Sequence, residues 1–160
     1  MTASVSPALK AFLEGGVAII AASRDAQNRP SIARGGGCRV ESDGRVTVFV
    51  AAEQSARCIE DVRATGAIAI LCVEPHTYEC YQIKGASGRV ATLDEQERRQ
   101  VVAYRRAFFA NLLSVGVAET VATGLLPAEP EGFVSIAFTP TEIFCNTPGP
   151  AVGTNENRPS

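Results

Sequence analysis

The strongest chemical signal in the sequence is a serine and an arginine at the expected start of a short helix. Ser55 follows an apolar segment and suits the N-cap position, where the first helical turn leaves backbone N–H groups without acceptors. Arg57 falls in that first turn, where a cation opposes the helix dipole unless an anion lies nearby. The pattern predicts an anion site suited to phosphate. An ordinary serine cap beside a solvated arginine is the alternative.

A second arginine precedes three glycines in an expected strand. Arg34 is followed by the run Gly35, Gly36 and Gly37, which leaves backbone open to close approach by a flat ligand or a neighbouring chain. A guanidinium next to such a run can bind phosphate through two parallel hydrogen bonds. A surface arginine on an edge strand beside a bulge is the alternative.

His76 and the cysteines are the other candidates for chemistry. His76 is the only histidine and lies in an expected turn, where it is either a general base or a solvated polar residue. The five cysteines are widely spread and form no C-x-x-C pair, so neither a disulfide framework nor a metal site is predicted. The sequence offers no Ser-His-Asp set or metal cluster, and catalytic residues stay unassigned.

The elements that must position these residues are mostly short strands. Hydrophobic periodicity predicts a short helix from Pro7 to the Gly15-Gly16 stop, and further helices at 55–66, 94–113 and 117–126. Strands are predicted at 17–23, 31–41, 45–51, 67–73, 78–90, 133–138 and 141–146. The segment 67–73 is apolar at every position, as expected for a strand buried on both faces. The pattern predicts a mainly β fold, an antiparallel barrel of six to seven strands with a few helices.

Length and charge narrow the classes of function. The chain has 160 residues, of which 46% are hydrophobic, and we expect one domain over residues 1–150 with a mobile tail over 151–160. Its 15 basic and 17 acidic residues form no basic block, which argues against nucleic acid and anionic membranes as partners. With no secretory or transmembrane stretch and no disulfide pattern, a cytoplasmic protein with a small-molecule partner is expected.

Several segments in order resemble the pyridoxamine 5′-phosphate oxidase-like, FMN-binding split-barrel family. They span about residues 8–146 and are Pro30-x-x-x-Arg34, Asp43-Gly44-Arg45, Ser55-x-Arg57, Asp61-Val62-Arg63 and Gln82-Ile83-Lys84-Gly85. The resemblance implies a homodimer with FMN bound at the subunit interface by both chains. It implies that Arg34, Ser55 and Arg57 contact the FMN phosphate. Val50 and Ala51 would meet the flavin ring through backbone groups, and Gln82 and Lys84 would face the flavin.

Two departures from the family pattern limit what the resemblance implies. Gly35 and Gly36 stand where relatives carry bulky apolar residues that support the ring, so ring placement stays open. The chain also lacks a carboxy-terminal Arg-x-His segment, so the namesake oxidase activity is not expected. The leading hypothesis is an FMN-dependent oxidoreductase acting on a small redox substrate. The alternatives are a non-enzymatic flavin, deazaflavin or haem binder, with His76 or a cysteine as haem ligand, and a dimer that has lost its cofactor.

Overall fold

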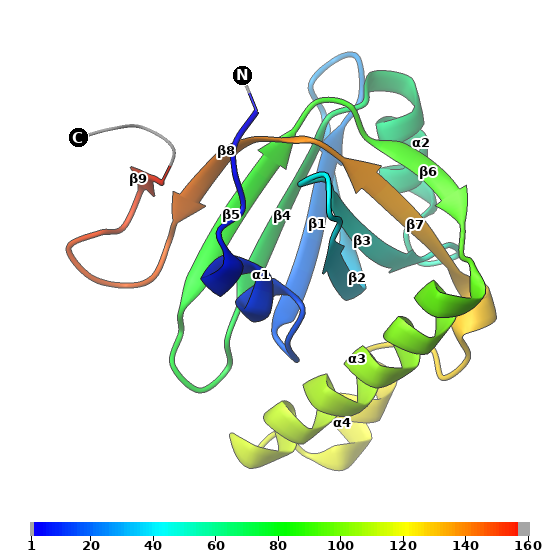
Figure 1. Ribbon diagram of the computed structural model, residues 1–160. Helices are drawn as coiled ribbons and strands as arrows, with labels where there is room; N and C mark the ends of the chain where they lie inside the picture. The colour runs from blue at the N-terminus through cyan, green and yellow to red at the C-terminus, as the bar shows by residue number, and fades with distance from the viewer. Residues whose placement is uncertain (1, 157–160) are drawn as a thin grey trace.

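The computed structural model describes residues 2–156, which form one antiparallel sheet flanked by helices (Figure 1). The strand order is β6-β7-β3-β2-β1-β4-β5-β8-β9. The strands are β1 (Ala18–Arg24), β2 (Pro30–Val40), β3 (Val46–Ala51), β4 (Ile68–Val73), β5 (Cys80–Gly85), β6 (Arg89–Thr92), β7 (Phe133–Phe138), β8 (Pro140–Cys145) and β9 (Thr154–Asn155). The helices are α1 (Pro7–Leu13), α2 (Ala56–Thr65), α3 (Glu95–Ser114) and α4 (Glu119–Gly124), with a 3₁₀ turn η1 (Pro130–Gly132).

Most elements follow the local sequence signals. Ser6 caps α1 by accepting a hydrogen bond from the Leu9 N–H at 3.2 Å, and Gly66 ends α2 in the left-handed conformation. Asp94 and Glu97 form a capping box at the start of α3, which satisfies two backbone N–H groups reciprocally. The predicted mainly β, antiparallel fold is therefore confirmed, although the described residues form nine strands rather than six or seven.

One sequence prediction of a strand was wrong. The single strand expected over 78–90 is divided into β5, which pairs with β8, and β6, which pairs with β7. The chain crosses between the two parts of the sheet at residues 86–88, and Figure 1 shows the two strands connected above the core. Within the tail expected over 151–160, Thr154 and Asn155 pair with β8 as β9, and the expected mobility of the tail stays a prediction. Residues 157–160 of that tail lie outside the described residues.

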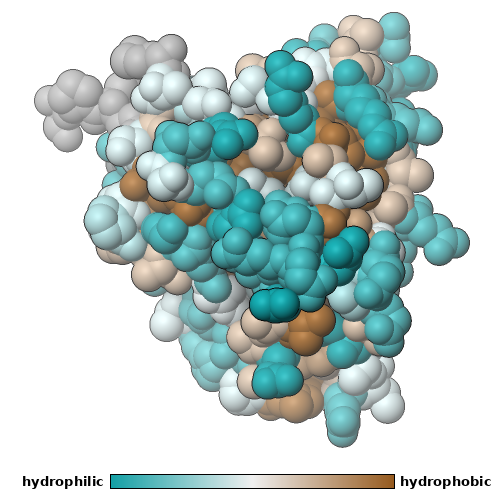
Figure 2. Space-filling view, turned by 45° about the vertical axis from the view of Figure 1, so that its right-hand side comes forward, coloured by the Kyte–Doolittle hydropathy of each residue, from teal (hydrophilic) through white to brown (hydrophobic). Residues whose placement is uncertain are grey.

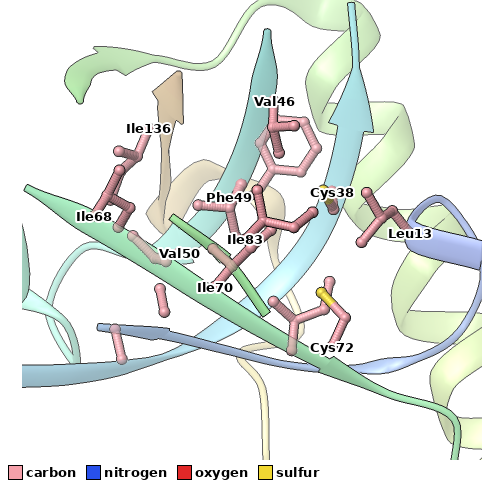
Figure 3. Close-up of a cluster of buried hydrophobic side chains, with 14 of the residues drawn as sticks. Leu13, Cys38, Val46, Phe49, Val50, Ile68, Ile70, Cys72, Ile83 and Ile136 are labelled. Carbon is pink, nitrogen blue, oxygen red and sulfur yellow. The ribbon is translucent and has the colours of Figure 1, made fainter. Parts of the chain in front are cut away.

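The core lies inside the curved sheet and combines aliphatic side chains with phenylalanines such as Phe49, Phe108 and Phe138. Ile70 of β4 and Ile83 of β5 lie directly opposite one another and are fully buried, as are Phe49 and Ile136. Figure 3 shows these side chains gathered in the space between the strands, with Leu13 of α1 closing one side. This packing fixes which face of each strand points outward.

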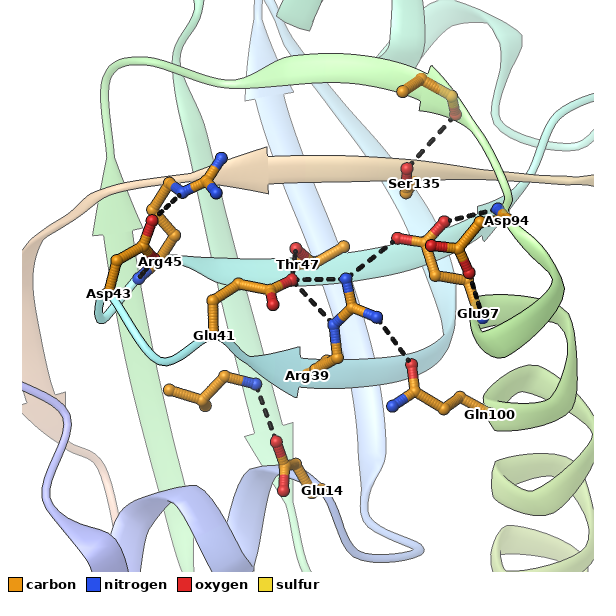
Figure 4. Close-up of polar contacts among 12 residues, drawn as sticks. Glu14, Arg39, Glu41, Asp43, Arg45, Thr47, Asp94, Glu97, Gln100 and Ser135 are labelled. Carbon is orange, nitrogen blue, oxygen red and sulfur yellow. Dashed lines mark hydrogen bonds and ion pairs between the residues drawn. The ribbon is translucent and has the colours of Figure 1, made fainter.

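A group of ion pairs holds α3 against the sheet (Figure 4). The Arg39 guanidinium on β2 lies 2.6 Å from the Glu41 carboxylate and 3.3 Å from the Glu97 carboxylate on α3. Further along α3, the Tyr104 hydroxyl donates to the Val17 carbonyl at 2.7 Å. The helix is thereby fixed at two points, close to the end of β2 and the start of β1.

Candidate functional site

The outward face of β2, β1, β4 and β5 carries three of the predicted ligand-binding residues. Residues directly opposite in antiparallel strands point to the same face, and the register gives one row of side chains across four strands. That row is Arg34, Ile20, Leu71 and Gln82. Lys84 belongs to the next row along the same strands, together with Ile32, Ala22 and Ala69. We call these two rows the outer face.

The outer face combines an apolar floor with polar ends. Ala22 and Ala69 contribute to the floor of a shallow groove of about 380 Å³, and Lys84 contributes to its wall. The Lys84 ammonium lies 3.8 Å from the Glu142 carboxylate and 4.6 Å from the centre of the Phe144 ring. Lys84 is therefore partly neutralised, while the small alanine side chains leave room for a flat molecule.

Arg34 is a half-buried cation whose guanidinium forms no ion pair or hydrogen bond within residues 2–156. Its charge acts on Tyr104: burial raises the pKa of that phenol, and the Arg34 charge opposes the rise. Val50 pairs with Gly35, so the end of β3 lies beside Arg34. A cation with open donors thus lies next to the segment that leads into α2.

The start of α2 leaves its backbone donors uncapped. The Ser55 N–H donates to the Ala51 carbonyl at 3.0 Å, which places Ser55 close to the end of β3 and hence to Arg34. Ser55 is the N-cap residue, but its ψ of 12° differs from the extended value of an ordinary cap, and its hydroxyl accepts no bond from the helix. Ser55 thus occupies the expected N-cap position, but the alternative of an ordinary side-chain cap is not formed. Ser55 is only 2% exposed, so an anion that used its hydroxyl and the unpaired first-turn N–H groups would have to approach along the end of β3.

Arg57 already has carboxylate partners in the chain. Its guanidinium lies 3.7 Å from Asp25, in the turn between β1 and β2, and 4.0 Å from Asp61 on α2. The side chain is 62% exposed. The sequence pattern predicted an anion that offsets the charge of Arg57 at the helix start. The carboxylates of Asp25 and Asp61 supply that negative charge from within the chain.

The glycine run serves packing inside the protein. A Cβ atom at Gly35 would overlap the Ile19 side chain, and one at Gly36 would overlap the Phe133 ring. Gly37 has a φ of 133°, which few other residues adopt, at the irregular part of the pairing between β2 and β3. These requirements explain the glycines without a ligand. Contacts of Gly35 and Gly36 with a cofactor stay a prediction.

The predicted contacts of Val50 and Ala51 also stay a prediction. Both side chains are buried in the core, so only their backbone groups could meet a ligand. Gln82 lies in the same row as Arg34 but three strands away, about 14 Å at the usual strand spacing.

His76 and the cysteines lie away from this arrangement. The His76 Nε2 atom lies 2.7 Å from the Ser114 hydroxyl, and both residues are exposed. All five cysteines are free and buried, and burial raises the pKa of Cys38 to about 12. A thiol that stays protonated at neutral pH is a poor nucleophile and a poor redox group.

Sequence reasoning missed Asp25 and Asp61 as partners of Arg57, as well as the apolar part of the outer face. Asp25 gave no local signal, because it lies 32 positions before Arg57, whereas Asp61 lies four residues after Arg57 on α2, the spacing at which helical side chains meet. The apolar part of the outer face did give a sequence signal. Strands β1 and β4 are apolar at nearly every position, yet Ile20 and Leu71 are only half-buried in the single chain.

Several solved structures share this fold, and the proteins carry different names. HupZ of Group A Streptococcus is 17% identical, with 93% of this chain and 99% of that chain covered and a TM-score of 0.55. A Lactobacillus delbrueckii protein provisionally named a pyridoxamine 5′-phosphate oxidase is 11% identical (89% and 94% covered, TM-score 0.52). HutZ, the heme storage protein from Vibrio cholerae, is 14% identical (89% and 95% covered, TM-score 0.51). No protein-family model and no curated protein matches the chain.

These likenesses define the fold. The chain is a split β-barrel of the pyridoxamine 5′-phosphate oxidase-like type, as the order of its sequence segments predicted. Identities of 17% or less leave the cofactor and the reaction to be argued from the residues of this chain.

Proposed function

We propose that this protein binds FMN and acts as a flavin-dependent oxidoreductase. Two observations carry the proposal: Arg34 has no counter-ion in the described chain, and the start of α2 at Ser55 is uncapped and follows the end of β3, which pairs with β2 next to Arg34. A guanidinium, a hydroxyl and helical N–H groups are donors suited to a phosphate dianion. The donor set therefore fits the phosphate end of FMN.

The flavin ring would lie on or beside the outer face. Bound FMN supplies hydride or electron transfer, so the chain need not contribute an acid or a base. The residues of the chain hold the phosphate, present a flat apolar surface and exclude water from it. We do not extend the proposal to oxidation of pyridoxamine phosphate, because the sequence lacks the Arg-x-His segment described above.

We further propose that two copies of the chain associate through the outer face. Ile32 is 73% exposed there, beside the half-buried Ile20 and Leu71. The other large exposed hydrophobic residues of the described chain lie on different elements, and Figure 2 shows small hydrophobic patches within a largely hydrophilic surface. A symmetric dimer would bring Gln82 and Lys84 of one chain toward the ligand held by the other. This arrangement gives these residues a role despite their separation from Arg34.

A visible absorption spectrum of the purified protein, followed by titration of apoprotein with FMN, tests the function. The proposal expects two broad flavin bands, or quenching of FMN fluorescence that saturates at one FMN per chain. Sedimentation velocity of the loaded protein tests the dimer. A colourless protein that leaves FMN fluorescence unchanged contradicts the proposal.

Haem binding is a second candidate, favoured by the shared fold with the heme storage protein HutZ. His76 is the one imidazole of the chain, and it is exposed and held by Ser114. The same spectrum separates the two, because haem gives a sharp Soret band that shifts when His76 is replaced by alanine. A deazaflavin in place of FMN would appear as a different chromophore, and a cofactor-free dimer would show neither spectrum.

A cytoplasmic location is the cellular setting that we propose. Five free, buried cysteines agree with the cytoplasmic location that we propose. Within residues 2–156, no helix is both long and apolar enough to cross a bilayer. The described residues also contain no group of three or more histidine, cysteine or acidic side chains arranged to hold a metal.

A further inference from the structure

Asp25 is a carboxylate shared by two arginines at the edge of the proposed phosphate site. Its Oδ2 atom lies 2.6 Å from Arg29 Nε and 3.7 Å from Arg57 Nη2. Its Oδ1 atom accepts the backbone N–H groups of Gln27 and Arg29, each at 2.9 Å. The turn thus holds Asp25 firmly, whereas the contact with Arg57 is the longer of the two ion pairs.

We propose that the Asp25 carboxylate competes with the phosphate of the ligand for the guanidinium of Arg57. Asp25 thereby sets the affinity of the site and its preference among differently charged ligands. The inference rests on the proposed function and adds one contact to it: Arg57, at the start of α2, also contacts the phosphate of FMN, as the family resemblance implied. In the free chain the Asp25 carboxylate occupies part of the donor capacity of Arg57. When a phosphate binds, it must replace the Asp25 carboxylate as the ion-pair partner of Arg57, and the carboxylate stays nearby.

The geometry allows this exchange without unfolding the turn. Asp25 keeps Arg29 and two backbone N–H groups as partners when Arg57 leaves. The Arg57 side chain is mostly exposed and free to change rotamer. Its other carboxylate, Asp61, is anchored by the Ser31 hydroxyl at 2.5 Å and lies 4.0 Å from Arg57, so it remains a weaker, fixed counter-ion.

Asp25 therefore acts on ligands according to their charge. The Asp25 carboxylate, which stays in its turn after the ligand binds, repels a phosphate dianion and has little effect on a neutral ligand. Riboflavin, which is FMN without its phosphate, is the neutral probe. Removal of the Asp25 charge should strengthen binding of FMN and leave binding of riboflavin unchanged.

The variant Asp25→Asn tests this inference, because asparagine keeps an oxygen that accepts the two turn N–H bonds. Asp43→Asn is the matched control: Asp43 also accepts a backbone N–H in a turn, from Arg45 at 3.1 Å, and its carboxylate pairs with the Arg45 side chain at 2.8 Å. It lies in the turn at the opposite end of β2. Both variants change the net charge by one unit, so general charge effects cancel.

Fluorescence titration of wild type and both variants with FMN and with riboflavin gives the result. We expect D25N to bind FMN about two- to fivefold more tightly than wild type, the range of an exposed ion pair. We expect D43N to match wild type, and riboflavin to bind all three proteins equally. Circular dichroism melting curves verify that the variants are folded.

The outcomes separate the two proposals. If wild type binds FMN and D25N binds it no more tightly than D43N does, Asp25 is not a competitor, although the proposed function stands. An equal gain for FMN and riboflavin in D25N also overturns the inference, since it indicates a structural effect. If none of the three proteins binds FMN, the proposed function fails and the inference fails with it.

Discussion

The starts of α1 and α2 are built from the same residue type and differ in what they leave open. Ser6 has a φ of −68° and a ψ of 158°, and its hydroxyl accepts a hydrogen bond from the helix that it begins. Ser55 has a φ of −114° and a ψ of 12°, and its hydroxyl makes no such bond. The two serines differ mainly in ψ. At α1 the serine side chain accepts a first-turn N–H, whereas at α2 these N–H groups have no side-chain acceptor.

This difference teaches that an N-cap residue does not by itself predict a cap. The hydroxyl of a serine reaches the first-turn N–H groups when the residue is extended, and loses them when ψ approaches zero. At α2 the backbone follows a tight turn from β3, because the Ser55 N–H bonds to the Ala51 carbonyl. The tight turn thus leaves the first-turn donors of α2 open, and it does so beside Arg34.

The largest expected effect comes from placing a negative charge at each helix start. Ser55→Asp should weaken FMN binding by a hundredfold or more, because like charges about 4 Å apart repel by roughly 4 kcal/mol near a protein surface. Ser6→Asp should leave FMN affinity unchanged. Equilibrium titration with FMN measures both, with circular dichroism to verify folding. Equal affinities for the two variants would remove the distinction between the helix starts.

Arg34 provides the next largest effect. Arg34→Ala should weaken FMN binding about 10- to 150-fold, since a charge-assisted hydrogen bond contributes roughly 1.5–3 kcal/mol. The matched control is Arg45→Ala, which removes an exposed arginine paired with Asp43 and should leave the affinity unchanged. Arg57→Ala should have a smaller effect than R34A, because Asp25 and Asp61 already partly satisfy that side chain. A larger loss in R57A than in R34A would reverse the assignment.

The smallest expected effect concerns stability alone. Ser6→Ala should lower the free energy of unfolding by about 1 kcal/mol, the usual cost of a lost cap. Ser55→Ala should lower it by less than Ser6→Ala does, because no cap hydrogen bond is lost. Denaturant titrations of the two variants and wild type measure the difference. A loss in S55A as large as that in S6A would mean that Ser55 does cap α2.

The sequence predicted the parts of the fold that local patterns control. Turn signals and alternating apolar residues placed β1 to β4, and Gly66 placed the end of α2. The division of residues 78–90 could not be predicted in the same way, because β5 and β6 differ in their partner strands rather than in their own residues. Pairing between β8 and β9 is likewise a tertiary choice.

The candidate site also contains features that local sequence could predict and features that depend on tertiary contacts. Arg34 and Ser55 could be selected from residue type and from their order along the chain. Their proximity depends on the pairing of Gly35 with Val50, and the counter-ions of Arg57 depend on where the turn between β1 and β2 lies in space. Local sequence carries residue chemistry, but it does not show which donors the folded chain has already used.

The measurement that tests the central claim most directly compares two ligands of the unaltered protein. FMN and riboflavin share the same ring and differ by the phosphate that Arg34 and the start of α2 are proposed to hold. Parallel fluorescence titrations should show FMN binding at least tenfold more tightly, as expected from one charge-assisted contact of about 1.5 kcal/mol or more. Equal affinity for FMN and riboflavin would contradict the account, since it would mean that no phosphate is held at this site.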